Sequence, residues 1–341
     1  MKLYDLRIPC DIDFDRAAVS NITGFAGLYE RDFKSAEPGE LAALPKAVAL
    51  GGFDGVHLGH RALLRSCVKY AAENLLLPSV WTFDEAPGAI FASHGGKAVC
   101  LSDAPSRRVM FAEAGIAAAA FEAFSDIRNI SPEAFVKDIL IGTLNTKAAF
   151  CGFNFTFGAG GKGKADDLVR LMKLHGGTAV VVPPLELDGA PVSSTRIREL
   201  LSAGDAGAAA RLLGEPWRLT SDVSRGRQFG RRLGIPTINQ HFPPDMLIPR
   251  FGVYETRCEI AGGSCYSAVT NVGMRPTVSY LPGGEPAAIA ESYLIGFQGD
   301  LYGKTVSTSF LRFIRPEIKF SSPEQLAEAM KNDIAKVKPE P

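Results

Sequence analysis

The sequence predicts a two-domain protein: an N-terminal α/β domain with a doubly wound parallel sheet, then a small antiparallel β-barrel with a terminal helix. The chain has 341 residues, which is more than one domain usually holds. Apolar runs alternate with amphipathic stretches over its first part, and short β-type runs follow Gly214 and Pro216. We therefore expect two domains, comprising residues 1–214 and 215–341.

The N-terminal alternation predicts strands and helices of the βα type. Such units form parallel sheets, which bind ligands at the carboxyl ends of their strands. The expected strands cover residues 46–53, 78–83, 148–157 and 178–185, and the expected helices cover residues 60–75, 106–115, 131–144 and 165–177.

The C-terminal region predicts a small barrel closed by Gly and Pro turns. A helix is expected over residues 321–337, with Ser322 as N-cap, Pro323 in the first turn and Gln325 completing a capping box. The expected strands cover residues 252–260, 264–272, 288–297 and 305–314.

Composition excludes several classes of partner. Lys plus Arg and Asp plus Glu number 37 each, so no overall field attracts nucleic acid or an acidic membrane surface. The six cysteines form no CxxC pair, which is typical of reduced thiols in a cytosolic protein. The N-terminus has acids where a signal peptide needs an apolar core. We expect a cytoplasmic protein with no nucleic-acid or membrane partner, and the oligomeric state stays open.

The stretch ALGGFDGVHLGHRALL, residues 49–64, indicates an anion site. Glycines let the chain turn after a strand, and the next helix directs its free N–H groups toward that turn. His57 and His60 are three residues apart, so both can donate to a phosphate. A single histidine there is more often a cap or a surface residue. The buried face of the helix is expected to hold Leu63, Leu64, Cys67, Val68 and Ala71.

The stretch PVSSTRIRELL, residues 191–201, is a second phosphate candidate. Ser193 or Ser194 can cap a helix. Ser194, Thr195 and Arg198 fall on neighbouring helical positions, where hydroxyls and a guanidinium suit a polyphosphate. Taken alone, a capped helix with surface arginines explains it better.

The stretch GAGGKG, residues 158–163, satisfies a dinucleotide-binding pattern that is weak by itself. A Walker A loop is excluded because Ala165 stands where Ser or Thr must be. We expect Phe153, Phe155 and Phe157 to share one face of a strand as core residues. Asn154 and the glycine loop are then the expected ligand contacts.

The stretch SRGRQFGRRLGIPTINQ, residues 224–240, predicts a basic, glycine-rich loop suited to phosphates, although an exposed basic turn is an alternative. Thr237 and Asn239 offer a hydroxyl and an amide oxygen two residues apart, which suit Mg²⁺. Glu291 lies in an apolar run, where an acid either faces solvent or acts as a base, and the run alone favours solvent.

The HxGH motif at 57–60 and the SSTxxR motif at 193–198 resemble those of the nucleotidyltransferase superfamily. With the motifs of the other half, the whole chain resembles the prokaryotic bifunctional riboflavin kinase and FMN adenylyltransferase, or FAD synthetase, family. The matching segments are GGFDGVHLGH (51–60), NFTFG (154–158), SSTRIR (193–198), GRRLGIPTIN (230–239), NVGMRPT (271–277) and ESYLIGFQGDLYG (291–303).

The resemblance implies ATP as co-substrate, Mg²⁺ as cofactor, riboflavin and FMN as substrates, and FMN and FAD as products. Catalytic roles are implied for His57, His60, Arg198 and, as the base on the ribityl hydroxyl of riboflavin, Glu291. In the adenylyltransferase it implies ATP contacts at Gly51, Phe53, Asp54, His57, His60, Ser194, Thr195 and Arg198, and FMN contacts at Asn154, Phe157 and Gly158. In the kinase it implies ATP contacts at Gly226, Gly230, Arg231, Thr237 and Asn239, with Thr237 and Asn239 also on the metal.

Some positions depart from the family pattern. Tyr293 stands where His is common, Gly296 where Asp is usual, and Ile238 where Ala is common. Gly52 replaces a frequent Asn, and residues 82–87 lack the usual Pro-His pair. Two rivals therefore remain: an adenylyltransferase whose barrel only binds flavin, and a non-catalytic flavin sensor. An NAD-dependent oxidoreductase, suggested only by GAGGKG, lacks a supporting ribose-binding acid.

Overall fold

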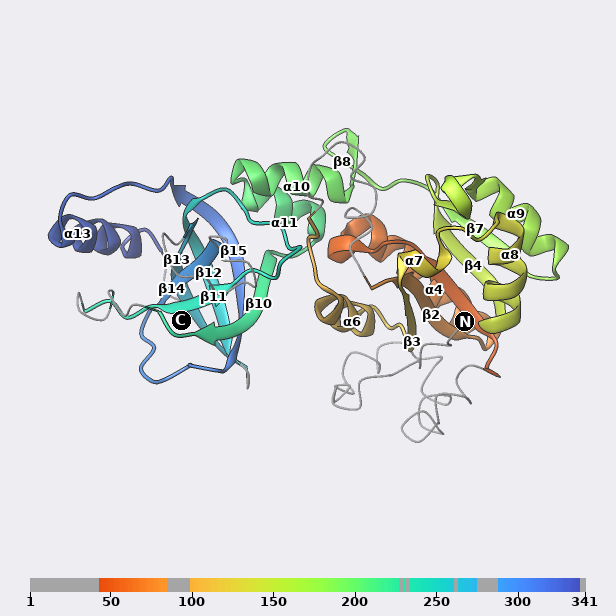
Figure 1. The fold of residues 1–341 in the computed structure, drawn as a ribbon, viewed down its shortest axis with the longest axis horizontal. Helices are drawn as coiled ribbons and strands as arrows, with labels where there is room; N and C mark the ends of the chain where they lie inside the picture. The colour runs from red at the N-terminus through yellow and green to blue at the C-terminus, as the bar shows by residue number, and fades with distance from the viewer. Residues whose placement is uncertain are drawn as a thin grey trace. The chain divides into compact units, whose positions relative to one another are not determined.

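The computed structural model describes residues 43–84, 99–226, 230, 234–260, 263–274 and 288–337. Contacts divide the chain into two units, one up to Val192 and one from Ser193 onward (Figure 1). All contacts given below lie within one unit.

The first unit is built on a parallel sheet with the strand order β3-β2-β1-β4-β7, which confirms the predicted doubly wound class. Chain order runs outward from β1 in both directions, so β1 and β4 meet at the topological switch point, where such sheets bind ligands. The strands are β1 (Lys46–Leu50), β2 (Leu77–Phe83), β3 (Ala118–Glu122), β4 (Thr146–Gly152) and β7 (Thr178–Val182).

Helices cover both faces of this sheet because β1 is apolar on both sides. Ala47 and Ala49 belong to one buried cluster, which includes the expected inner face of α4, and Val48 and Leu50 belong to another. The expected helix over 131–144 forms as a short α-turn followed by a π-helix. The helices are η1 (Asp54–Val56), α4 (Leu58–Asn74), α6 (Ala104–Glu113), α7 (Phe124–Ile127), α8 (Pro132–Ala134), η2 (Phe135–Thr143), η3 (Ala159–Gly161) and α9 (Ala165–Leu174).

The strand expected over 148–157 is wrong beyond Gly152. The chain turns there, with the Phe155 N–H donating to the Gly152 carbonyl, and the side chain of Phe153 is 51% exposed. Phe153 therefore does not join Phe155 and Phe157 in the core. GAGGKG instead connects two short antiparallel strands, β5 (Thr156–Phe157) and β6 (Gly163–Lys164), which is not the geometry of a dinucleotide loop.

The second unit contains a closed antiparallel barrel with the strand order β10-β11-β14-β13-β12-β15, as predicted. The sequence did not reveal β10 or β11. The strands are β10 (Trp217–Ser224), β11 (Ile238–His241), β12 (Gly252–Ile260), β13 (Ser264–Met274), β14 (Ala288–Leu294) and β15 (Thr305–Arg315).

Two helices, α10 (Ser194–Ala203) and α11 (Ala206–Leu213), group with the barrel because α11 packs against β10 and β15. The contacts thus divide the chain before these helices, whereas the sequence placed a boundary after them. A hairpin of β8 (Glu186–Leu187) and β9 (Ala190–Pro191) precedes α10 in the chain.

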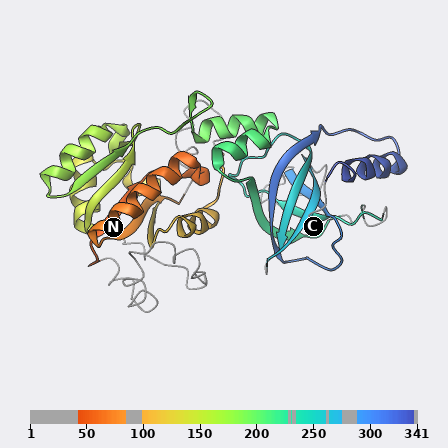
Figure 2. The ribbon, with the colours of Figure 1, turned by 180° about the vertical axis from the view of Figure 1, so that it is seen from behind.

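The terminal helix α13 (Pro323–Ile334) begins as predicted, since the Ser322 side chain accepts a hydrogen bond from the Gln325 N–H. An ion pair between Arg315 and the buried Asp333, with an N···O distance of 2.8 Å, ties it to β15. Figures 1 and 2 show α13 on the opposite side of the barrel from α10 and α11.

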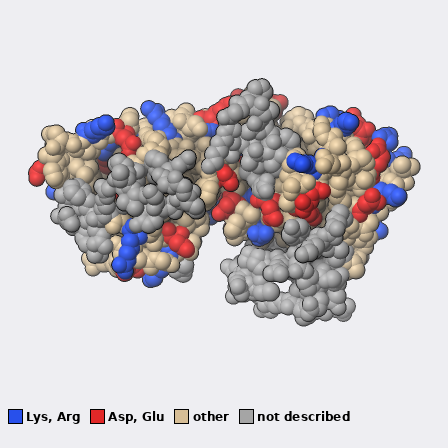
Figure 3. Space-filling view, in the orientation of Figure 1, with Lys and Arg blue, Asp and Glu red and all other residues tan. Residues whose placement is uncertain are grey.

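The described surface carries both signs of charge. Figure 3 shows Lys and Arg interspersed with Asp and Glu on the face drawn. The five cysteines in the described segments are free thiols. Within those segments, no helix is long and apolar enough to cross a membrane.

Candidate functional site

The turn between β1 and α4 has an unusual backbone. Phe53 and Val56 adopt left-handed conformations, with φ of 48° and 38°, and Gly55 between them has φ of 76°. Left-handed residues other than glycine cost about 1–3 kcal/mol each and persist only where surrounding contacts fix them. The turn is therefore strained and needs support from the rest of the unit.

His57 and His60 emerge from this turn as a stacked pair. Their ring centroids are 3.7 Å apart, and the His57 Nδ1 accepts a hydrogen bond from the His60 backbone N–H. His57 therefore carries its proton on Nε2, where it can donate to a ligand. A Cβ on Gly59 would lie 3.2 Å from the His57 ring, which explains the glycine of the HxGH motif.

The second histidine of the pair is neutral at neutral pH. Burial, and then the charge of His57, hold the pKa of the His60 imidazole well below its ordinary value of 6.5. Its Nδ1 atom is buried without a hydrogen-bond partner. The pair thus offers phosphates N–H donors rather than two fixed positive charges.

Asp54 and Phe53 support the turn from within. The Asp54 carboxylate accepts hydrogen bonds from the Leu101 and Ser102 N–H groups at 2.7 and 3.2 Å, and the Gly55 N–H donates to the Ser102 Oγ at 2.9 Å. The Phe53 ring is fully buried, and a Cβ on the predicted ATP contact Gly51 would lie 3.3 Å from it. Both predicted ATP-contact side chains therefore have structural partners in the fold.

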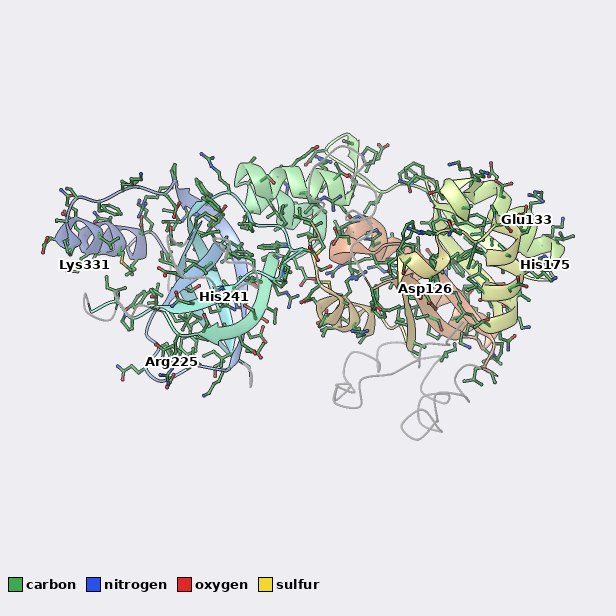
Figure 4. All side chains as sticks on the ribbon, viewed as in Figure 1. Asp126, Glu133, His175, Arg225, His241 and Lys331 are labelled. Carbon is green, nitrogen blue, oxygen red and sulfur yellow. The ribbon has the colours of Figure 1, made fainter. Side chains whose placement is uncertain are left out.

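The predicted FMN residues lie at and after the end of β4. Because β4 neighbours β1 in parallel, the exposed Asn154 follows β4 at the same sheet edge at which the turn to His57 follows β1. Phe157 is buried with its ring on that of Phe135. His175, labelled in Figure 4, caps the end of α9 before β7 and thus lies at the opposite edge.

Gly158 is required by packing. Its φ is 72°, and a Cβ there would lie 2.8 Å from the Pro132 ring. The Ala159 N–H donates to the Ile130 carbonyl at 2.7 Å, which fixes the start of the glycine loop.

The SSTxxR motif begins α10. Ser193 is the N-cap and accepts a hydrogen bond from the Arg196 N–H at 3.3 Å, and the Arg198 guanidinium lies 3.5 Å from the Thr195 hydroxyl. Ser194, Thr195 and Arg198 belong to the second unit, whereas the two histidines belong to the first.

Two of the predicted kinase residues, Asn239 and Glu291, lie in a row across neighbouring barrel strands together with Asn271. Asn239 on β11 and Asn271 on β13 are each paired directly with Glu291 on β14. The residues next to them in the strands, Gln240 and Ser292, are fully buried, as expected for side chains that fill the barrel. Strand alternation therefore places the row on the outer surface of the barrel. Sequence reasoning assigned no role to Asn271, because only strand register reveals its place beside Glu291.

Gly226 packs against Asn239 of this row, and Gly230 packs against the segment that leads to it. A Cβ on Gly226 would overlap the side-chain amide of Asn239, and a Cβ on Gly230 would overlap the Ile235 carbonyl and lie 3.4 Å from the Thr237 hydroxyl. Arg231 lies outside the described residues. Asn239, against which Gly226 packs, is 5% exposed although its strand position faces outward.

The atoms at this position fit a hard cation. The Asn239 Oδ1 atom is buried without a hydrogen-bond partner. A buried amide oxygen left unpaired is costly unless a ligand completes it, and oxygen donors are those that Mg²⁺ prefers. Among the described residues, no cluster of three or more His, Cys, Asp or Glu side chains offers another metal site.

The positions that depart from the family pattern have clear places. Tyr293 is half-buried on β14, two residues from Glu291 and on the same face. Gly296 has φ of 79°, a conformation that favours glycine, in the turn after that strand. Arg225, labelled in Figure 4, precedes the loop and has its guanidinium 5.3 Å from the centroid of the Tyr302 ring.

Comparison with known proteins identifies both halves. The family model described as FAD synthetase matches residues 41–196, and that described as riboflavin kinase matches residues 213–339. A bifunctional riboflavin kinase/FMN adenylyltransferase of Pseudomonas fluorescens is 34% identical, over 84% of this chain and 90% of that protein. The chain belongs to this bifunctional transferase family. A member from Listeria monocytogenes is 29% identical over 86% of this chain and 92% of its own length.

A solved structure supports the same fold. A crystal structure from Streptococcus pneumoniae, titled as a macrolide-efflux protein, matches with a TM-score of 0.76 and 30% identity, over 87% of this chain and 95% of that one. That name denotes a different activity from those of the family members given above, and it is not assigned to this chain.

Proposed function

We propose that the chain converts riboflavin and ATP to FMN and ADP at the barrel, and FMN and ATP to FAD and pyrophosphate at the N-terminal site, in the cytoplasm. We assign the adenylyltransferase to residues 1–214 and the kinase to residues 215–341. The observation that carries the proposal is the direct cross-strand pairing of Asn239 with Glu291, which puts an amide oxygen and a carboxylate side by side on one barrel face.

In the kinase step, the terminal ribityl hydroxyl oxygen of riboflavin attacks the γ-phosphorus of ATP. The new O–P bond replaces the bond to the β-phosphate oxygen, which leaves on ADP, and Glu291 accepts the hydroxyl proton. A hydroxyl is a poor nucleophile, so a carboxylate within reach of its proton accelerates attack. Asn271 pairs with Glu291 on the side away from Asn239, and its side-chain amide donates to the Glu317 carboxylate at 3.4 Å.

Thr237 and Asn239 would hold Mg²⁺, which, when bound, neutralises charge on the ATP phosphates. The Asn239 Oδ1 atom supports this assignment, because it is buried without a hydrogen-bond partner and a bound metal ion would serve as its partner. Gly226 and Gly230 permit close approach of the loop backbone, and its N–H groups suit phosphate oxygens.

In the adenylyltransferase step, an FMN phosphate oxygen attacks the α-phosphorus of ATP, and the bond to the β-phosphate oxygen breaks to release pyrophosphate. This chemistry needs positioning and charge neutralisation rather than a covalent nucleophile. His57 would donate through Nε2, and the neutral His60 would remain a donor without needing to gain a proton. Ser194, Thr195 and Arg198 would bind the triphosphate, and Asn154 with the loop from Gly158 would bind FMN.

The test is to incubate the purified full chain with ATP, Mg²⁺ and either riboflavin or FMN, and to separate the flavins by chromatography. Wild type should make FMN and FAD from riboflavin. Glu291→Gln should abolish FMN formation but leave FAD formation from FMN, and His57→Ala with His60→Ala should do the reverse. Glu259→Gln, on an exposed position of β12, and His175→Ala are the matched controls.

Each outcome decides between readings of the chain. An unchanged kinase rate in Glu291→Gln would remove the base from the scheme. FAD from FMN alone in wild type would leave an adenylyltransferase with a flavin-binding barrel. No product from either flavin would favour a sensor.

A further inference from the structure

Arg107 is a buried arginine that sequence reasoning did not single out. It lies on α6, is only 2% exposed, and reaches the turn between β1 and α4. Its guanidinium donates to the Gly52 carbonyl at 3.1 Å, the Thr82 hydroxyl at 3.4 Å and the Asp84 carbonyl at 2.9 Å. Among the described residues, its acceptors are therefore two carbonyls and a hydroxyl, without a carboxylate.

A buried cation with only neutral acceptors is unusual. Buried charges in proteins are normally paired, because removing them from water is costly. Burial lowers the pKa of Arg107, and the nearby carboxylate of Asp54, which is held by backbone N–H groups, opposes this shift. The Arg107 Nε atom is also buried without a partner. Positive charge is thus retained here at a cost to stability.

The position of this charge links it to the anion site. Gly52 lies in the strained turn that leads from β1 to His57, and its carbonyl also accepts a hydrogen bond from the Thr82 hydroxyl at 3.3 Å. Arg107 therefore fixes the turn. It also places a cation at the sheet edge where α4 begins. In a region sheltered from water, such a charge acts over several ångströms.

We infer that Arg107 is a positioning residue of the adenylyltransferase site, which holds the Gly52 carbonyl and whose buried charge favours the triphosphate of ATP. This inference rests on the proposed function of the His57–His60 site. The carboxylates of Asp54, Asp84 and Asp103 lie near this charge and oppose the effect of burial on the Arg107 pKa, and a bound polyanion would add to them.

The test uses the full chain with FMN as the flavin, because this reaction reports only the adenylyltransferase. The KM for ATP, the kcat, and the inhibition constants of ADP and AMP against ATP are measured for Arg107→Met. If the charge acts on phosphates, the loss of affinity grows with ligand charge, to about tenfold for ATP and about twofold for AMP. Arg108→Met is the control, since Arg108 also lies over the Phe121 ring but is half-exposed.

Two further variants separate charge from position. Arg107→Lys keeps the charge but cannot span Gly52 and Asp84, and Thr82→Val removes the other donor to Gly52 without changing charge. Both should lower kcat and change ATP, ADP and AMP affinity by one common factor. These variants keep the inference testable if Arg107→Met does not fold.

The inference is overturned if Arg107→Met loses the same factor of affinity for ATP, ADP and AMP. It is also overturned if the loss of affinity in Arg107→Lys grows with ligand charge, or if neither variant loses affinity or activity. FAD synthesis that survives in His57→Ala with His60→Ala would instead overturn the proposed function of the site. The two failures are thus distinguishable.

Discussion

The two candidate sites are built by different means. In the first unit, a strained turn is held by hydrogen bonds from distant segments: Ser102, Arg107 and the backbone at Leu101 all bind it. In the second unit, Asn239, Asn271 and Glu291 sit on regular strands, and cross-strand register alone brings them together. The first site depends on hydrogen bonds from distant segments, and the second depends on strand register, with Gly226 packed against Asn239.

The difference predicts how each site fails. A clamped turn loses its geometry gradually as individual hydrogen bonds or contacts are removed, because the others remain. A site set by register keeps its backbone positions, so it fails when one side chain is displaced. Substitutions at glycines in contact with each site test this comparison directly.

The largest effect is expected for Gly226→Ala. The new methyl group would overlap the amide of Asn239, which is buried. We expect FMN formation from riboflavin to fall about 100-fold, the scale of a misplaced catalytic group, with FAD formation from FMN unchanged. Gly207→Ala on α11, where a Cβ meets nothing closer than 3.8 Å, is the control. Unchanged kinase activity would exclude Asn239 from the site.

A smaller effect is expected for Gly59→Ala. Its methyl group would lie 3.2 Å from the His57 ring, which is stacked on His60 and cannot retreat in that direction. We expect FAD formation from FMN to fall about tenfold, or about 1.4 kcal/mol in the barrier, with the kinase unaffected. Gly142→Ala is equally crowded, at 3.2 Å from the Lys137 carbonyl, but lies away from the turn. An equal loss in that control would contradict a specific role for the histidine pair.

The neutral His60 predicts that the stability of the first unit depends on pH. An unfolded histidine binds a proton near pH 6.5, whereas folded His60 does so only well below that pH. Below that value the unfolded state therefore binds more protons, so the free energy of unfolding falls as pH falls, by at most about 1.4 kcal/mol per pH unit.

Tryptophan fluorescence can follow that unit. The chain has two tryptophans, Trp81 in β2 and Trp217 in β10, so Trp217→Phe leaves only the reporter of the first unit. In that background, denaturant unfolding is measured at pH 7 and pH 5.5. The free energy of unfolding should fall less between these pH values in His60→Asn than in the protein that retains His60. An identical pH slope in the two proteins would refute the assignment.

The smallest effect is expected for Leu75→Gly. Leu75 ends α4 with φ of 56° and is 71% exposed, so its left-handed strain supports no site and its side chain buries little. Glycine there should raise the free energy of unfolding of the first unit by about 0.5–1 kcal/mol, with both activities unchanged. A lower free energy of unfolding would mean that the left-handed conformation of Leu75 costs nothing. The left-handed conformation of Phe53 would then no longer indicate a strained turn.

Both fold classes were predictable from local patterns, but several elements were not. The edge strand β3 has the sequence AAAFE, whose alanines have low strand propensity. β11 has only four residues, and β10 follows directly on an alanine-rich helix. The strand expected through Phe157 ends early because a turn at Gly152 breaks an alternation that looked continuous. Periodicity cannot detect such a turn, because the residue types in the sequence go on alternating through it.

The sequence by itself determined the family, the order of the motifs, and the residue types suited to phosphate and metal, because chemistry and spacing are local properties. Only the tertiary structure decided which residues support them. Arg107 lies 55 positions from Gly52 in the chain, and Asn271 meets Glu291 only through the register of β13 and β14. Such contacts arise from burial and strand pairing between distant segments, which no local pattern records.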